Sequence, residues 1–155
     1  MSKITKEETK KLFDELKEEY NLNDWKLKFS RAYTTFGQCD YNSKRIIVSE
    51  KAIEQTTYKD VKQTLIHEFA HAIVGPSHNH NEVWRKQCIA MGGKGERCAS
   101  VSLDKPYKYI VGCYDGCWKK RYMNRPKYNV ARRICGKCKG KLFLRKLDKD
   151  GNYEL

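Results

Sequence analysis

The sequence contains no long apolar run, no internal repeat and no low-complexity segment. A membrane-spanning helix needs roughly 20 consecutive apolar residues, so we expect no such helix and no membrane partner. The residues after Met1 are rich in lysine and glutamate and lack the apolar core of a signal peptide. We therefore expect an intracellular protein, cytoplasmic or DNA-associated, that is not secreted.

Apolar residues are not scarce enough for a disordered chain. They make up 39% of the 155 residues, and 33% of the residues are charged. A chain of this length builds one compact core, with at most a small additional unit. The composition thus predicts a folded, basic protein.

Acidic residues are scarce only in the last third of the chain. Residues 105–155 carry 15 lysines and arginines against 4 acidic residues, a net charge of +11, whereas the whole chain carries +13. Such an uneven distribution suggests two parts with separate roles, residues 1–104 and residues 105–155, the second binding a polyanion such as nucleic acid. The alternative is that these charges only keep the protein in solution.

The apolar pattern predicts an α+β fold in the first part. Thr5 and Glu8 have the spacing of a capping box at the start of an N-terminal helix over residues 5–20. Further helices are predicted over residues 58–74 and 82–91, with strands over residues 25–29, 36–41 and 45–48. We expect the strands to form a short antiparallel sheet, and short strands to follow Pro106.

All four histidines lie within 14 residues, at positions 67, 71, 78 and 80. His67 and His71 belong to an HExxH sequence on a predicted helix, where residues four apart point the same way and reach one zinc ion. Glu68, rotated by about 100° around the helix, would face a zinc-bound water as the general base.

A catalytic zinc ion needs a third protein ligand and an open fourth position. Gly75 and Pro76 break the helix, so that the chain can turn back and bring His78 or His80 to the metal. We favour His80, because a helix start at Asn81 follows it and would fix its imidazole. The sequence thus predicts a catalytic zinc site of His67, His71 and His80.

The register excludes one known HExxH pattern, and two simpler interpretations stay open. The metzincin sequence HExxHxxGxxH would require glycine and histidine where this chain has Val74 and Ser77. HExxH could also occur by chance on an ordinary helix, or mark a zinc site that has lost its chemistry. The presence of Glu68 argues against the loss of chemistry.

Seven cysteines in a reducing compartment favour metal binding over disulfides. Cys113-x3-Cys117 and Cys135-x2-Cys138, separated by 17 residues, have the spacing of a structural zinc site with four thiolates. Four thiols without metal are the alternative. The remaining cysteines, expected to be small buried apolar residues, are Cys39, Cys88 and Cys98.

Aromatic and cationic residues alternate between the two cysteine pairs. Cations can contact phosphates while Trp118, Tyr122 or Tyr128 stack on exposed bases, a combination that suits single-stranded or frayed DNA. The aromatics could instead only pack the small core of the ribbon. The candidate contacts are Trp118, Lys119, Lys120, Arg121, Arg125, Lys127, Arg132 and Arg133.

Residues 67–87, HEFAHAIVGPSHNHNEVWRKQ, resemble the core of the SprT-like (spartan-type) zinc metallopeptidases. In that family HExxH is followed by a histidine and, four residues later, an aromatic residue, here His80 and Trp84. Asn81 stands where the family often has glycine. The similarity extends over about residues 5–147.

These observations predict a zinc-dependent endopeptidase: a small zincin-like domain over residues 1–104 with one catalytic zinc ion, and a basic zinc ribbon over residues 105–155 with one structural zinc ion. The resemblance implies substrates bound or crosslinked to DNA, and hence a role in DNA repair. The alternative is a non-catalytic zinc protein that binds nucleic acid and uses the HExxH domain as a scaffold. Cleavage of free proteins without nucleic acid is a third possibility.

Overall fold

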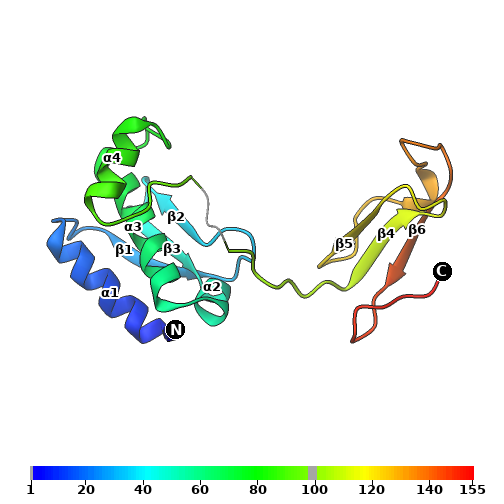
Figure 1. The fold of residues 1–155 in the computed structure, drawn as a ribbon, viewed down its shortest axis with the longest axis horizontal. Helices are drawn as coiled ribbons and strands as arrows, with labels where there is room; N and C mark the ends of the chain where they lie inside the picture. The colour runs from blue at the N-terminus through cyan, green and yellow to red at the C-terminus, as the bar shows by residue number, and fades with distance from the viewer. Residues whose placement is uncertain (1, 98–100) are drawn as a thin grey trace. The chain divides into compact units, whose positions relative to one another are not determined.

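The computed structural model describes residues 2–97 and 101–155, so Cys98 lies outside the described residues. The chain divides into two compact units, Met1–Asp104 and Lys105–Leu155 (Figure 1). Both contain helical and extended segments, which makes the fold mixed α and β. Within the described part of the chain, no helix has the length and apolar character needed to cross a membrane.

The first unit begins with α1 (Lys6–Glu19), as the sequence predicts. The capping box is present: the Thr5 backbone N–H donates to Glu8 Oε2 at 2.7 Å, and the Glu8 N–H donates to Thr5 Oγ1 at 3.1 Å. These bonds satisfy backbone donors that a helix start leaves free. The buried face of α1 consists of Thr9, Leu12, Phe13 and Leu16.

The sheet of the first unit is mixed, which corrects the prediction of an antiparallel sheet. Its strands β1 (Lys26–Ser30), β2 (Gly37–Asp40) and β3 (Arg45–Ser49) lie in the order β1-β3-β2. β1 is parallel to β3 and β2 is antiparallel to it. Period-two alternation indicates a strand and its buried face but not its partner. The apolar β3, the most deeply buried of the three strands, lies at the centre of the sheet.

One helix packs against this sheet and also contacts the other helices of the first unit. α3 (Tyr58–Val74) contacts β2, β3 and α1, and the rings of Phe13 and Phe69 lie 5.3 Å apart in the shared core. α3 has the predicted bounds and ends at Gly75, whose N–H donates to the His71 carbonyl. A short helix that the apolar pattern does not predict, α2 (Glu50–Gln55), begins after the N-cap Ser49. α4 (Glu82–Ala90) contacts α3.

The second unit is a small antiparallel sheet with strand order β5-β4-β6. Its elements are β4 (Tyr109–Cys113), β5 (Lys119–Tyr122), the 3-10 turn η1 (Val130–Arg132) and β6 (Leu142–Lys146). The apolar cluster of this unit is small, with Ile110, Phe143 and Leu147 buried. A core this small is a weak source of stability, and units of this kind commonly need a metal or another crosslink.

Candidate metal centres

Three imidazoles converge at the C-terminal half of α3. The Nε2 atoms are 3.0 Å apart between His67 and His80, 3.1 Å between His71 and His80, and 3.3 Å between His67 and His71. His67 and His71 lie one turn apart on α3, and His80 comes from the loop before α4. The break at Gly75 is what allows this loop to return to the helix.

The spacing fits a tetrahedral cation. Two nitrogen ligands at 2.0 to 2.1 Å from a zinc ion are about 3.3 Å apart in tetrahedral geometry, close to the distances between the three Nε2 atoms. Burial lowers the pKa of His67 and of His71 to about 4, so both rings are neutral at physiological pH and present a lone pair. The three imidazoles are thus suited to hold one metal ion.

The indole of Trp84, on α4, lies against all three imidazoles. Its ring centroid is 4.7 Å from those of His67 and His80, and it stacks on His71 at 5.2 Å with 23° between the planes. Trp84 is 1% exposed, and its Nε1–H donates to the backbone carbonyl of His67 at 3.4 Å. The indole therefore restricts the orientation of every ring in the cluster.

His67 has a second restraint from the loop after α4. A hydrogen bond to the Glu96 backbone favours the protonated ring and partly opposes the effect of burial on the pKa of His67. Because Nε2 faces the other imidazoles, Nδ1 is the nitrogen free to donate to a carbonyl. Such a bond fixes the tautomer that leaves Nε2 as the ligand atom.

His78 lies outside the imidazole cluster. Its Nδ1 accepts a hydrogen bond from Asn81 Nδ2 at 3.1 Å, and the Asn81 backbone N–H donates to the His78 carbonyl at 3.0 Å. Asn81 Oδ1 meanwhile caps α4 by accepting from Val83 and Trp84. His78 and Asn81 thus close the turn that contains His80.

Glu68 is buried beside the cluster and lines a cavity of about 340 Å³. Burial raises the pKa of its carboxyl to about 8. The carboxylate packs against Gly37 at the start of β2, where a Cβ atom would lie 2.8 Å from Glu68 Oε1. His67 lines the same cavity, so an acid–base group and an imidazole of the cluster face one space.

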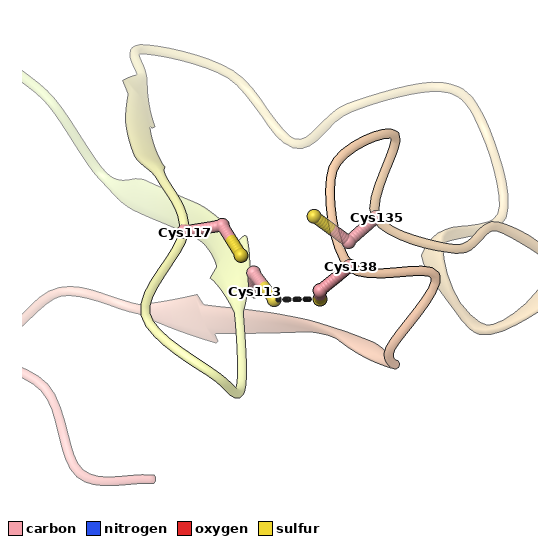
Figure 2. Close-up of side chains that lie close together, drawn as sticks. All are labelled: Cys113, Cys117, Cys135 and Cys138. Carbon is pink, nitrogen blue, oxygen red and sulfur yellow. Dashed lines mark hydrogen bonds between the residues drawn. The ribbon is translucent and has the colours of Figure 1, made fainter.

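The second candidate centre consists of four cysteine sulfurs in the second unit. Figure 2 shows Cys113 and Cys117 at one turn and Cys135 and Cys138 at another, with all four side chains directed toward one another. The four Sγ atoms lie within 4.8 Å of one another, and those of Cys113 and Cys138 are 3.4 Å apart. Sulfur ligands at about 2.3 Å from a zinc ion lie near this spacing, so the cluster fits a tetrahedral metal.

Backbone groups favour the thiolate form of one member of this cluster, Cys135. Hydrogen bonds from the backbone of Cys138 and Lys137 lower the pKa of the Cys135 thiol to about 6, although burial opposes them. Asp115, which was not among the predicted site residues, places Oδ2 3.3 Å from Cys138 Sγ. The sequence could have indicated this contact only through the place of Asp115 between two predicted metal ligands, in Cys113-x-Asp-Gly-Cys117.

The remaining cysteines differ in exposure. Cys88 is 2% exposed, as predicted, whereas Cys39 is only half-buried. Burial raises the pKa of the Cys39 thiol to about 12, and the negative charge of Glu68 adds to the shift. Neither residue belongs to a candidate metal centre in the part of the chain that the structure describes.

One group of candidate nucleic-acid contacts lies on and beside the edge strand β5. Lys120 packs over the ring of Tyr122, whose hydroxyl is 3.0 Å from that of Tyr128, and Arg133 lies 4.6 Å from the centre of the Tyr128 ring. This group, here called the Tyr122–Tyr128 face, combines cations with aromatic rings.

Other candidate contacts lie elsewhere in the second unit. On the opposite side of β5, Lys119 lies over Tyr153 and Arg121 donates to the Gly151 carbonyl. Arg125 and Lys127 line a groove beside η1 and β6. Arg132 is exposed on η1, and Trp118 is half-buried before β5.

Comparison with known proteins matches residues 5–103, well over half of the chain, to the SprT-like family. "Protein SprT-like" of Lysinibacillus sphaericus is 27% identical over 124 residues, covering 75% of this chain and 80% of the relative. The protein of the same name from Bacillus cereus is 28% identical over 120 residues, covering 74% and 78%. The "Germ cell nuclear acidic-1 protein" of Caenorhabditis elegans is 27% identical over 133 residues, but this chain spans only 24% of its length.

Among solved structures, the metallopeptidase zymogen of Methanocaldococcus jannaschii jannalysin aligns with a TM-score of 0.49 and 15% identity. The alignment covers 57% of this chain and 85% of that structure. The family assignment rests on the sequence match, which spans α1 to α4 and includes the three imidazoles and Glu68. The chain belongs to the SprT-like family.

Proposed function

We propose that the protein is a zinc-dependent endopeptidase that acts on proteins associated with DNA, including proteins crosslinked to DNA. The observation that carries the proposal is the convergence of three Nε2 atoms within 3.3 Å, beside a buried carboxylate that faces a cavity. Membership of the SprT-like family supports the same activity.

His67, His71 and His80 would hold the catalytic ion, and three protein ligands leave a fourth position for substrate or water. Zinc bound there supplies a Lewis acid that polarises a peptide carbonyl and makes water more acidic. The Glu68 carboxylate accepts a proton from the attacking water and returns it to the nitrogen of the leaving amine. The pKa of about 8 for Glu68 would fall with a divalent cation nearby, because opposite charge favours the ionised carboxyl.

The surrounding residues keep this geometry fixed. Trp84 restricts all three rings, and the contact of His67 with Glu96 orients its Nε2. Preorganised groups avoid the cost of reorientation during reaction. The main chain at Gly37 limits where the Glu68 carboxylate can move.

The second unit would hold a structural zinc ion and bind DNA. The four cysteine sulfurs supply a thiolate site. Residues 105–155 carry a net charge of +11 with four neutral thiols, and four thiolates with one Zn²⁺ lower this charge by 2, to +9. Exposed cations next to aromatic rings suit single-stranded or frayed DNA. DNA binding would bring a weakly selective active site to DNA-bound proteins.

The proposal is tested with Glu68→Gln, which keeps the shape of the side chain but removes the acid–base group. We expect this variant to retain its zinc and its DNA affinity and to lose cleavage of a DNA-bound protein substrate. Equal cleavage by variant and parent would reject the mechanism. Absence of cleavage in both would favour the alternative of a non-catalytic zinc protein that uses the first unit as a scaffold.

The requirement for DNA is a separate part of the proposal. Cleavage of the same protein substrate is compared with and without single-stranded DNA. Equal rates would indicate an endopeptidase for free proteins and would leave the role of Glu68 intact.

A further inference from the structure

The cavity beside Glu68 extends away from the imidazoles along α3. Its buried end is formed by Glu68 and Cys88, and half-buried Thr64 and Phe36 form its walls. The exposed rim includes side chains of α3 and of residues 94–97. A volume of about 340 Å³ accommodates a substrate side chain together with its main chain.

The rim that includes residues 94–97 is held against α3. Gln63 Oε1 accepts from the Lys94 backbone N–H at 3.1 Å, and Gln63 Nε2 donates to the Gly92 carbonyl at 3.2 Å. Gly95 packs against Arg85 and Ile89 of α4, where an added Cβ would lie only 3.0 Å from each. The backbone of this segment therefore has a defined position at the cavity, and Lys94 and Arg97 extend from it at the rim.

Three cations line the rim: Lys59, Lys94 and Arg97. Within residues 2–97 and 101–155, none of them lies within salt-bridge distance of a carboxylate. The carboxylate of Asp60, also at the cavity, is engaged by the N–H and hydroxyl of Thr57 at 3.1 and 2.7 Å. Glu96 is the other carboxylate of the rim, so three cations face two carboxylates there, a net charge of +1, while Glu68 lies at the buried end of the cavity.

We propose that this cavity binds an acidic side chain of the substrate, Asp or Glu, next to the scissile peptide bond, through Lys59, Lys94 and Arg97. The inference rests on the proposed peptidase function and deepens it by naming a class of cleavage site. A carboxylate at the rim gains charge-assisted contacts with cations that no protein carboxylate occupies. A lysine or arginine in the same place would meet like charge.

Cleavage sites are tested by digesting an unbiased peptide library with the zinc-loaded protein and reading the products by mass spectrometry. We expect Asp and Glu to be enriched at one position adjacent to the cleaved bond. Two peptides that differ only by Glu or Gln at this position should then differ by about 1.5-fold to fivefold in kcat/KM, the range for exposed ion pairs. The double variant Lys94→Glu/Arg97→Glu should abolish or reverse this preference.

Lys62→Glu is the matched control, because Lys62 is exposed on α3 but does not line the cavity. It should leave the preference for Glu unchanged. Cleavage of the library without acidic enrichment would overturn the specificity proposal and leave the peptidase function standing. Inhibition by a single-stranded oligonucleotide that Lys94→Glu/Arg97→Glu relieves would also overturn it, because the cations would then bind phosphate.

A binding measurement separates this inference from the peptidase function itself. An alanine-rich peptide with one central Glu, and its Gln counterpart, are titrated into the Glu68→Gln variant by fluorescence anisotropy. The proposal predicts tighter binding of the Glu peptide, and this preference should disappear when Lys94→Glu/Arg97→Glu are added. That result supports binding of an acidic side chain in the cavity even if the parent protein cleaves nothing. Equal affinity for both peptides contradicts it.

Discussion

Gly37 lies directly against Glu68. A Cβ atom at position 37 would be 2.8 Å from both Cγ and Oε1 of Glu68, and 2.7 Å from Thr64 Cγ2. Gly37 pairs with Val48, so it shares the face of the sheet that carries the buried β3 residues and faces α3. The absence of a side chain at this position allows β2 to approach α3 and to confine the carboxylate.

Gly37→Ala is expected to move Glu68 without removing a metal ligand. The new methyl group would displace Thr64 or the Glu68 side chain, and overpacking of this kind costs about 1 to 3 kcal/mol. Because a displacement of about 1 Å can cost 100-fold in rate, we expect peptidase kcat to fall by about 10- to 100-fold. Steady-state kinetics together with zinc content test this. Activity equal to that of the parent would show that the contact does not position Glu68.

The local elements were predictable, whereas the contacts between them were not. Helical periodicity and Gly75 predict α3 with its observed bounds, and the capping box predicts the start of α1. Strand alternation could not reveal that β3 lies between β1 and β2, because pairing depends on residues far apart in sequence. The prediction of an antiparallel sheet was therefore wrong, because β1 pairs with β3 in the parallel direction.

The candidate site shows the same division. The sequence offered His78 and His80 as the third imidazole and favoured His80, which the structure places against His67 and His71. The stacking of Trp84 on His71 joins residues 13 positions apart, and the approach of Gly37 to Glu68 joins residues 31 positions apart. No local pattern encodes such contacts, because packing in three dimensions determines them.

His78 is expected to support zinc binding through His80. His78→Ala removes the acceptor for Asn81 and should loosen the turn that holds the His80 imidazole. Loss of a group bonded directly to a ligand weakens metal affinity by about 10- to 100-fold, and because His78 acts on His80 through the turn, we expect a loss of about 10-fold or less. Competition with a chelator, and the absorption bands of the cobalt-substituted protein, measure this.

His78→Asn is the rescue variant for this prediction. Its Oδ1 occupies nearly the same place as the imidazole Nδ1 and can accept from Asn81. We therefore expect nearly parental affinity for zinc. Equal affinity in the alanine variant, or failure of asparagine to restore it, would contradict a positioning role.

The second unit is expected to depend on metal for its folding. Cys135→Ser should lower the zinc content from two ions to one per chain and unfold residues 105–155, because their apolar cluster is small. Metal analysis and amide NMR spectra report both effects, with signals from the first unit unchanged. Cys88→Ala is the control: it removes a buried cysteine of the first unit and should keep two zinc ions. A second unit that stays folded without metal would contradict the prediction.

DNA affinity is expected to depend on the Tyr122–Tyr128 face more than on the opposite side of β5. Lys120 and Arg133 lie over the rings of Tyr122 and Tyr128, where a base can stack beside a neutralised phosphate. Each phosphate contact on single-stranded DNA contributes about 0.7 to the slope of log affinity against log salt. Lys120→Ala/Arg133→Ala should therefore reduce the slope by about 1.4, measured by fluorescence anisotropy from low to high salt.

Lys119→Ala/Arg121→Ala is the matched control for this face, because it removes the same charge from the opposite side of the same unit. If bases stack and phosphates bind on the Tyr122–Tyr128 face, this control variant should change the salt slope little. Tyr128→Leu should then weaken DNA binding without changing the slope, because it removes a ring and no charge. Equal slopes for the two double variants would show that the positive charge acts as a diffuse field. An affinity independent of salt in the parent would remove the argument for phosphate contacts altogether.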